Sequence, residues 1–420
     1  MSGITERKRF WAITGLIGSG HGLSHFYFLC LPPLFPLLKE EFGVSYAALG
    51  LLITLMNLMT AIFQVPSGML VDRYGAQLIL IGGLVLAGVG IGLIGFAGSY
   101  WMMIVLVIVS GLGNSVFHPA DYAILTTSID RKVLGRAFGL HTFTGNIGFM
   151  TAPVVMVLLA TWMGWRGAMI TVGLASIAVV IPLVLYGTVL RDEVSVEPEH
   201  NGASGDPVPD RTGLKLYLNG PVMMFFMFFM TIGMVSTGVQ TFSVTTLVQL
   251  HGLGLGAANT VLTVFLVATA AGVLLGGPLA DWTSRHALVA SLAMVIGAAV
   301  FFTVNAAVLP YMATAALFLI AGVALGTVRP ARDMMVRDMT PKGATGRVFA
   351  FVSTGLNLGS ATTPILLGYL IDLGYANAVF AVVGIILLLS VATVTLVQNR
   401  TGQALAPQLA EAGSGEPPAE

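Results

Sequence analysis

The sequence predicts an all-α membrane protein with twelve transmembrane helices, arranged as two pseudo-symmetric domains of six helices each. Of its 420 residues, 56% are hydrophobic and only 9% are charged, whereas about 25% of the residues in soluble domains are charged. The hydrophobic residues gather into segments of about 20 residues, the length that an α-helix needs to cross a bilayer. A third observation, an internal repeat, divides the chain into two similar halves.

The repeat appears when the chain is compared with itself at a shift of 211 positions. At this shift His118-Pro119-Ala120 corresponds to Arg329-Pro330-Ala331. Identical residues pair at Gly135 and Gly346, Arg136 and Arg347, Phe138 and Phe349, Asn146 and Asn357, Gly148 and Gly359, Thr151 and Thr362, and Pro153 and Pro364. Such a repeat of apolar helices is typical of transporters whose substrate site lies between the halves near mid-membrane. We therefore interpret the position occupied by His118 and Arg329 as part of a site.

Six predicted spans lie in each half. They cover residues 11–38, 46–71, 78–98, 101–127, 134–160 and 166–189, and then 218–247, 255–280, 287–307, 310–335, 346–371 and 376–397. Two polar segments contain too little apolar surface to fold alone. We therefore expect a first domain at residues 1–190, a cytoplasmic linker at 191–217, a second domain at 218–400 and a disordered tail at 401–420.

The distribution of positive charge predicts the orientation of these spans. Cytoplasmic loops of membrane proteins carry an excess of Lys and Arg. If both termini are cytoplasmic, fifteen of the nineteen Lys and Arg residues lie in inner loops or tails, and only Lys39 and Arg166 lie outside. Arg329 and Arg332 fall in or near the tenth span. We expect a multi-pass protein of the inner (plasma) membrane with both termini in the cytoplasm.

A short motif recurs in the loops after the second and eighth spans. The first copy is Gly68-Met69-Leu70-Val71-Asp72-Arg73-Tyr74-Gly75, and the second runs from Gly277 to Arg285 with Asp281 at its centre. Both resemble the signature of the major facilitator superfamily, and the resemblance covers essentially the whole chain. It implies the major facilitator fold and a conformational latch in which an Asp caps a helix and pairs with an Arg. The implied latch residues are Gly68, Asp72, Arg73, Gly75, Asp281, Arg285, Arg131 and Arg136.

Two segments of the first half carry a narrower resemblance. Gly22-Leu23-Ser24-His25-Phe26 and Gly113-Asn114-Ser115-Val116-Phe117-His118-Pro119 look like the corresponding segments of the fosmidomycin-resistance group of facilitators, which are proton-driven exporters. This resemblance implies export by proton antiport. The segment from Arg329 to Asp333 has no counterpart in it, so the substrate is not carried over.

Ionisable residues within the spans are candidates for function, because each costs about 2.5 to 3.5 kcal/mol to insert into a membrane. His21 lies near the midplane of the first span, with His25 one turn further on the same face. His118 and Asp121 share one face of the fourth span, and the proline between them favours a kink. Imidazole titrates near neutral pH. We interpret the proton-coupling residues as Asp121, His21, His118 and Asp333.

Two alternatives remain for these residues. The histidines can be neutral groups bonded to backbone or hydroxyl partners. Asp121 can be a permanently ionised partner of Arg329 or Arg332.

Arg329 and Arg332 belong either to the cavity or to the cytoplasmic end of the tenth span. The alignment of Arg329 with His118 favours the cavity, since inner loops begin about twelve positions later in both copies. A guanidinium can hold a carboxylate or phosphonate with two hydrogen bonds. His141 and Thr241 add uncharged donors. The predicted substrate-binding residues are His21, His25, His118, Arg329, Arg332, Gln240, Asn146 and Asn357.

The sequence therefore predicts a secondary active transporter that moves a small organic anion by proton-coupled alternating access, with export favoured. The alternatives are proton-symport uptake of a carboxylate, and a transport-fold sensor that binds solute without moving it. We find no nucleotide-binding glycine loop, metal-ligand spacing or nucleophile motif, so no catalytic activity, cofactor or metal is expected. The expected partners are the solute, protons and the lipid bilayer, without nucleic acid, and the chain is expected to act as a monomer.

Overall fold

The computed structural model describes residues 6–187, 220–339 and 345–413. Within these ranges the regular structure is helical throughout, which confirms the predicted fold class. The helices of the first half are α1 (Glu6–Phe28), the 3-10 helix η1 (Pro32–Leu34), α2 (Phe35–Phe42), α3 (Tyr46–Tyr74), α4 (Ala76–Ile94), α5 (Tyr100–Asn114), α6 (Phe117–Ser128) and α7 (Arg131–Leu185). Those of the second half are α9 (Gly220–His251), α10 (Leu255–Trp282), α11 (His286–Ala306), α12 (Tyr311–Met339), α13 (Thr345–Asp372) and α14 (Ala378–Gly413).

The described helices are consistent with twelve crossings. Nine helical segments among the described residues are long and apolar enough to span a membrane. One of them, Lys132–Leu185, is broken at Met163 and Gly164, where the backbone leaves the helical region. This break lies between the predicted fifth and sixth spans. Counting α7 as two crossings, and adding α1 and α13, completes the set.

Two predicted boundaries differ from the structure, and a third predicted segment cannot be compared with it. The first helix ends at Phe28 rather than near residue 38, because Pro32 and Pro33 follow and start η1 instead. The linker at 191–217 lies outside the described residues. The expected tail at 401–420 is helical as far as Gly413, since its alanine, leucine and glutamine residues are good helix formers that extend α14.

The fourth predicted span is divided into α5 and α6 just before Pro119. Proline has no N–H to donate to the carbonyl four residues back, and its ring clashes with that carbonyl. The residue four positions before Pro119 is Ser115, which lies at the break. The helix is therefore interrupted at the proline where a kink was expected.

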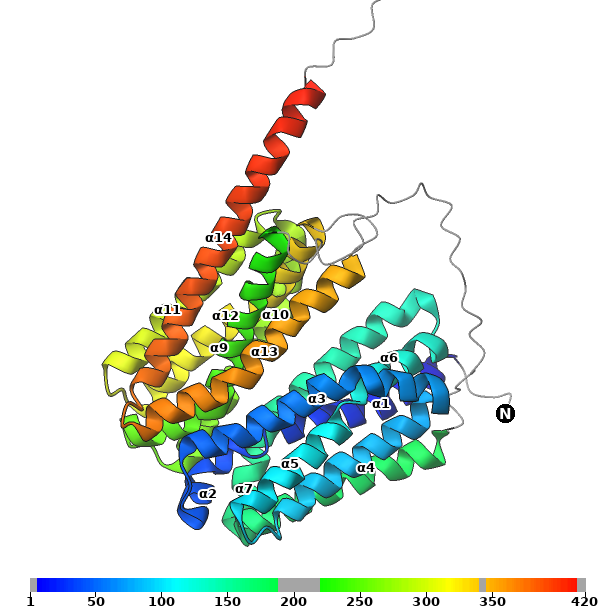
Figure 1. The fold of residues 1–420 in the computed structure, drawn as a ribbon, viewed down its shortest axis with the longest axis vertical. Coiled ribbons are helices and arrows are strands. Elements are labelled where there is room, and N and C mark those ends of the chain that lie inside the picture. Colours follow the sequence, from blue (N-terminus) through cyan, green and yellow to red (C-terminus); the bar gives the residue numbers. More distant parts are fainter. Residues whose placement is uncertain (1–5, 188–219, 340–344, 414–420) are drawn as a thin grey trace, which may run out of the picture.

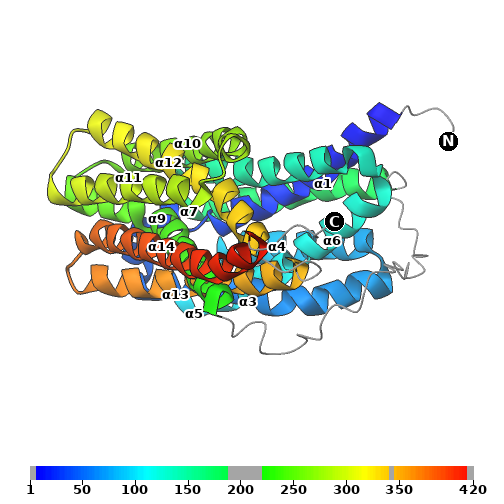
Figure 2. The ribbon, with the colours of Figure 1, turned by 90° about the horizontal axis from the view of Figure 1, so that it is seen from above.

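The two halves of the chain form separate bundles that meet along two pairs of helices (Figures 1 and 2). At this interface α3 packs along α13, and α7 packs along α10. In Figure 1 the bundles converge near α2 and diverge toward the side where α14 projects beyond the bundles. The chain thus has two unequal ends, one where the halves are joined and one where they spread.

Polar contacts hold the halves together at the joined end. Both carboxylate oxygens of Asp372, at the end of α13, accept hydrogen bonds at 2.8 Å from the backbone N–H groups of Tyr46 and Ala47. Deeper in the interface, Thr54 donates to the carbonyl of Ala361 at 2.6 Å. A carboxylate at a helix N-terminus is stabilised by the unpaired N–H groups and the helix dipole. Asp372 is therefore an N-terminal cap supplied to α3 by the opposite half.

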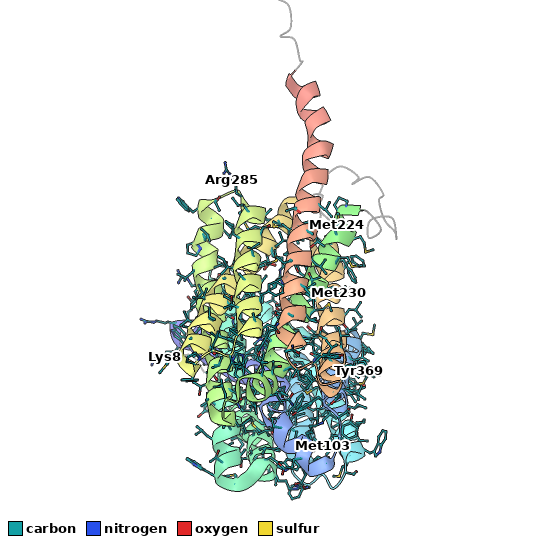
Figure 3. All side chains as sticks on the ribbon, turned by 90° about the vertical axis from the view of Figure 1, so that its left-hand side faces the viewer. Lys8, Met103, Met224, Met230, Arg285 and Tyr369 are labelled. Atoms are coloured by element: carbon teal, nitrogen blue, oxygen red, sulfur yellow. The ribbon has the colours of Figure 1, made fainter. Side chains whose placement is uncertain are left out.

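The outer surface of the bundles is apolar. Trp101 and Tyr369 are 74% and 56% exposed, and Tyr369 points outward in Figure 3. Arg285 lies toward the end from which α14 projects, while Met103 lies toward the opposite end (Figure 3). An outer surface of exposed aromatic and aliphatic side chains is what a lipid-embedded protein requires.

Candidate functional site

A cavity of about 350 Å³ lies between the two halves. Both halves contribute polar side chains to its wall, and no Asp or Glu is among the described residues that line it. The ionisable and amide side chains that line it are His25, Asn57, Gln64, Asn114, His118, Gln240, Arg329, Arg332 and Asn357. Such a pocket, with a few convergent polar groups in a largely apolar protein, is the default binding site of a membrane carrier.

Two arginines of α12 enter this cavity but have different surroundings. Arg332 Nε donates to Asp333 Oδ1 at 2.9 Å, and Nη2 forms an ion pair with the same oxygen at 2.8 Å. The guanidinium of Arg332 lies 4.2 Å from the ring centre of Phe229. Arg329 forms no ion pair within the described part of the chain. Asp333 therefore pairs directly with Arg332, whereas Arg329 has no carboxylate at ion-pair distance among the described residues.

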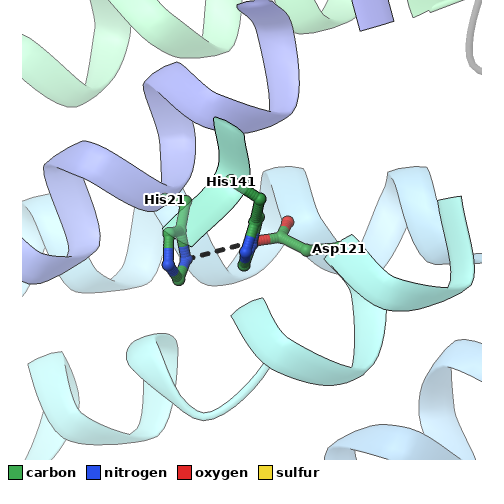
Figure 4. A group of neighbouring side chains, drawn as sticks. All are labelled: His21, Asp121 and His141. Atoms are coloured by element: carbon green, nitrogen blue, oxygen red, sulfur yellow. Dashed lines mark hydrogen bonds and ion pairs between the residues drawn. The ribbon is translucent and has the colours of Figure 1, made fainter. Parts of the chain in front are cut away.

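Behind the cavity wall lies a buried cluster formed by His21 of α1, Asp121 of α6 and His141 of α7 (Figure 4). His141 Nε2 is 2.9 Å from Asp121 Oδ2, a hydrogen-bond distance, and the rings of His21 and His141 stack at 3.6 Å between centres. His21 Nδ1 lies 3.4 Å from the same carboxylate oxygen. This nitrogen and Asp121 Oδ1 are both buried without a hydrogen-bond partner among the described residues.

The cluster is connected to the cavity through two further histidines. The ring of His21 lies 4.4 Å from that of His25 and 5.5 Å from that of His118, and both of these residues line the cavity. Gly145 of α7 leaves room for this group, because a Cβ atom there would lie 2.9 Å from atoms of both His21 and His25. The first half therefore places four imidazoles and one carboxylate in contiguous positions, ending at the cavity wall.

The spacing within the cluster has two chemical readings. The ligand atoms of His21, Asp121 and His141 all lie within 4.8 Å of one another, close enough to hold a metal ion. However, one nitrogen of each imidazole, Nδ1 of His21 and Nε2 of His141, approaches Oδ2 of Asp121. The other carboxylate oxygen, Oδ1, has no hydrogen-bond partner among the described residues. A shared oxygen between two imidazoles is the arrangement in which a proton can be exchanged.

The structure places six of the eight predicted substrate-binding residues on the cavity wall. These are His25, His118, Gln240, Arg329, Arg332 and Asn357. His21 lies behind the wall. Asn146 does not line the cavity, and its amide donates to the carbonyl of Thr142.

The predicted latch residues lie at the end of the bundles where the halves spread. Asp72, Arg73, Arg136, Asp281 and Arg285 are exposed, and Asp72 forms no ion pair with Arg136 in the described chain. Gly75 ends α3 with a φ of 87°, a conformation that glycine adopts without strain. Gly68 packs near Pro119. The side chain of Arg131 lies outside the described residues.

Sequence reasoning named His141 only as an uncharged donor and did not name Asn57 or Gln64. A histidine within a span was the available signal for His141. The sequence does not show how α7 is rotated about its axis relative to α6. The contact between His141 and Asp121 could therefore not be predicted from it. Asn57 and Gln64 lie seven positions apart in α3, where polar residues on one helical face were a signal that went unused.

Comparison with known proteins identifies the family. A family model described as Major Facilitator Superfamily matches residues 17–303 and 237–415. The chain belongs to the major facilitator superfamily. As a member of this superfamily it is a multi-pass membrane protein, and its family and fold are those of transporters of small solutes.

The names of individual relatives within the superfamily indicate different functions. The fosmidomycin resistance protein of Escherichia coli is 25% identical over 94% of this chain and 95% of its own length. A probable sulfoacetate transporter of Cupriavidus necator is 34% identical over 34% of this chain and 33% of its own. A membrane sensor protein of Escherichia coli is 23% identical over 91% of each chain.

A solved structure has the same fold as this facilitator. The crystal structure of a bacterial homolog to the human lysosomal transporter Spinster, in an inward-facing and occupied conformation, superposes with a TM-score of 0.75 and 16% identity. The match covers 95% of this chain and 98% of that one.

Proposed function

We propose that this facilitator moves a small organic anion across the plasma membrane by alternating access, coupled to the movement of protons. The observation that carries the proposal is Arg329, a guanidinium in the wall of a cavity with no carboxylate lining among the described residues. A charge placed inside a membrane protein is costly unless it has a partner. An anionic solute supplies that partner.

The donor groups around Arg329 suit an organic acid. A guanidinium binds a carboxylate, sulfonate or phosphonate with two parallel hydrogen bonds. Gln240 of α9 and Asn357 of α13 add amide groups to the same wall, and Asn57 of α3 faces them from the other half. A solute held by groups of both halves binds to both bundles at once, as alternating access requires.

Movement between two states rests on the contacts at each end of the bundles. We propose that the domains at residues 1–190 and 218–400 rock about the cavity, releasing the cap that Asp372 gives to α3 at the joined end. At the spread end, the exposed Asp72 and Asp281 loops then close as the latch. The carrier acts as a monomer in this mechanism.

Orientation is proposed from the charge distribution, with both termini and the linker in the cytoplasm. The joined end then faces outward. Because Cys30 is buried, new cysteines can be labelled against a low background. A reagent confined to the outside should label Lys39→Cys but not Arg285→Cys in intact cells, and the reverse result would invert the topology.

Export is the direction suggested by similarity to the fosmidomycin resistance protein. Uptake by proton symport is the second candidate, and a specific observation favours it. The titratable groups Asp121, His21 and His118 lie beside the anion cavity. Protons bound there attract an anion rather than displace it.

Transport and binding of defined anions test the proposal. Vesicles containing the purified protein should take up labelled fosmidomycin or sulfoacetate when a proton gradient is imposed. The variant Arg329→Gln should lose this uptake while keeping the wild-type melting temperature. Binding without any flux would identify a sensor, and undiminished uptake by a well-folded Arg329→Gln protein would remove the basis for an anionic solute.

A further inference from the structure

Asp121 cannot meet a solute in the cavity directly. Its side chain is fully buried, with 0% of its surface exposed, and neither it nor His21 lines the cavity. His25 and His118 form the intervening wall. The proton-coupling groups and the substrate groups are therefore two adjacent sites separated by one layer of imidazoles.

His141 has the closest contact with Asp121 in this arrangement. Its Nε2 lies 2.9 Å from Oδ2, whereas His21 Nδ1 lies at 3.4 Å without hydrogen-bond geometry. The stacked rings of His21 and His141 keep both imidazoles over the same carboxylate oxygen. His141 thus holds the carboxylate in one orientation, and His21 connects it to the cavity wall.

On the basis of the proposed function, we infer that His141, Asp121 and His21 form a single buried proton site, with His141 as a positioning residue, and that an anion bound beside Arg329 favours proton binding there. The proton enters from cavity water through His25 or His118 and is returned the same way. No covalent bond forms or breaks other than those to the transferred proton.

The titratable and charged groups around Asp121 determine how strongly this site binds a proton. From α1 it faces His21 and, behind it, His25; from α7 it faces His141. On its own helix the neighbours are His118 and Tyr122, whose rings lie 5.7 Å apart. Helix α4, which packs on α6, has no titratable residue. Helix α3 also packs on α6, and its titratable residues lie at its two ends: Tyr46 at the start, and Asp72, Arg73 and Tyr74 at the finish. Across the cavity the fixed charges are those of Arg329 and Arg332.

The charge of the cluster determines whether anion binding and proton binding favour or oppose each other. With both histidines neutral and Asp121 ionised, the cluster carries one negative charge and repels a bound anion. One added proton cancels this charge. Two unit charges about 10 Å apart at an effective dielectric constant of about 20 change an equilibrium by roughly tenfold. By reciprocity, anion binding raises the proton affinity by the same factor as protonation raises the anion affinity. This is the sign of symport.

The test measures anion binding and proton uptake together in the purified full-length protein. Sulfoacetate is the probe for the pH profile and for proton uptake, because its sulfonate and carboxylate both stay ionised from about pH 5.5 to 8.5. Fosmidomycin, whose phosphonate itself titrates in this range, serves only as a second binding probe at one pH. Dissociation constants are measured across the range, and proton uptake is followed by a pH indicator in weak buffer. The wild-type affinity should fall roughly tenfold as the pH rises, and binding should take up protons. His141→Gln should flatten this pH profile while retaining binding at high pH.

A matched control uses a buried histidine outside the cluster. His286 begins α11 in the other half, and His286→Gln should keep the full pH profile. Asp121→Asn should flatten the profile as His141→Gln does. Melting temperatures of all variants separate loss of the proton site from loss of the fold.

Several outcomes would overturn the inference. These are an unchanged pH profile in folded His141→Gln, proton release instead of uptake on anion binding, or a melting temperature raised by Zn²⁺ in the wild type but not in His141→Gln. The last result would identify a metal site. If neither anion binds to the wild type, the proposed anion function fails first.

Discussion

The two halves of the repeat carry different chemistry at the same two positions. His118 and Asp121 in the first half correspond to Arg329 and Arg332 in the second. In the first half, the acid is buried behind the cavity and surrounded by imidazoles. In the second half, both basic groups line the cavity.

This difference suggests how a duplicated helix bundle can divide anion binding and proton binding between its two copies. Arginine stays protonated at any physiological pH, so it can mark where an anion binds but cannot carry an exchangeable proton. Imidazole and carboxylate exchange protons but do not hold a permanent positive charge. In the proposed mechanism, this assignment places the solute at the cavity wall of the second half and the proton at the buried cluster of the first.

The backbone differs between the copies as well. Before Pro119 the chain breaks into α5 and α6, whereas α12 runs through Pro330 without interruption. In both copies a glycine of the following span approaches a backbone carbonyl so closely that a Cβ atom would clash, Gly148 with Gly22 and Gly359 with Met230. Both copies therefore have this close packing between spans, while the division of the helix before the proline is found, within the described residues, only in the half with the buried cluster.

The largest effect should come from the two arginines, which differ in their partners. Losing a charged hydrogen-bond partner costs about 1.5 to 3 kcal/mol, so Arg329→Ala should weaken anion binding roughly ten- to a hundredfold. Arg329→Lys should weaken it less, because the charge is kept and the bidentate geometry lost. Arg332→Lys should have the smallest effect, since Asp333 already offsets its charge. Dissociation constants measured beside melting temperatures decide this, and equal losses for Arg329→Lys and Arg332→Lys would contradict it.

The second largest effect should come from the contact that Asp372 makes between the two halves. Asp372→Asn keeps the size of the side chain but removes a charged acceptor from two backbone N–H groups. The joined end should then open about tenfold more often, as expected for a lost charge-assisted hydrogen bond. The labelling rate of Thr54→Cys by an external reagent measures this opening.

Lys39→Gln is the control for that experiment. Lys39 Nζ lies 3.7 Å from Asp372 and is 41% exposed, and exposed ion pairs contribute little. In the Lys39→Gln variant, Thr54→Cys should be labelled at the same rate as in a protein that keeps Lys39. An opening rate that changed equally in both variants would assign the effect to surface charge rather than to the helix cap.

A smaller effect is expected from Gly145 in the first half. Gly145→Ala would press on the rings of His21 and His25, and overpacking of this kind costs about 1 kcal/mol or more. Gly139→Ala lies in the same helix with no atom within 4 Å of its added Cβ, so its melting temperature should not fall. Equal melting temperatures for the two variants would show that the histidines are not tightly packed.

The fold followed from the sequence because hydrophobic length and charge distribution determine where a chain crosses a membrane. The repeat also brought Arg329 and His118 to one cavity in the prediction. What the sequence could not supply was the rotation of each helix about its axis. That rotation decides that His141 lies on Asp121, that Asn146 bonds its own helix, and that His21 is behind the wall.

Solute-for-solute exchange in vesicles, compared with gradient-driven uptake, tests the division of roles most directly. Exchange needs the anion site but no net proton movement, whereas uptake driven by a proton gradient needs both sites. Asp121→Asn should abolish gradient-driven accumulation and keep exchange, while Arg329→Ala should lose both. If exchange is lost equally in the two variants, or if gradient-driven uptake persists in Asp121→Asn, the two halves do not divide anion and proton binding between them.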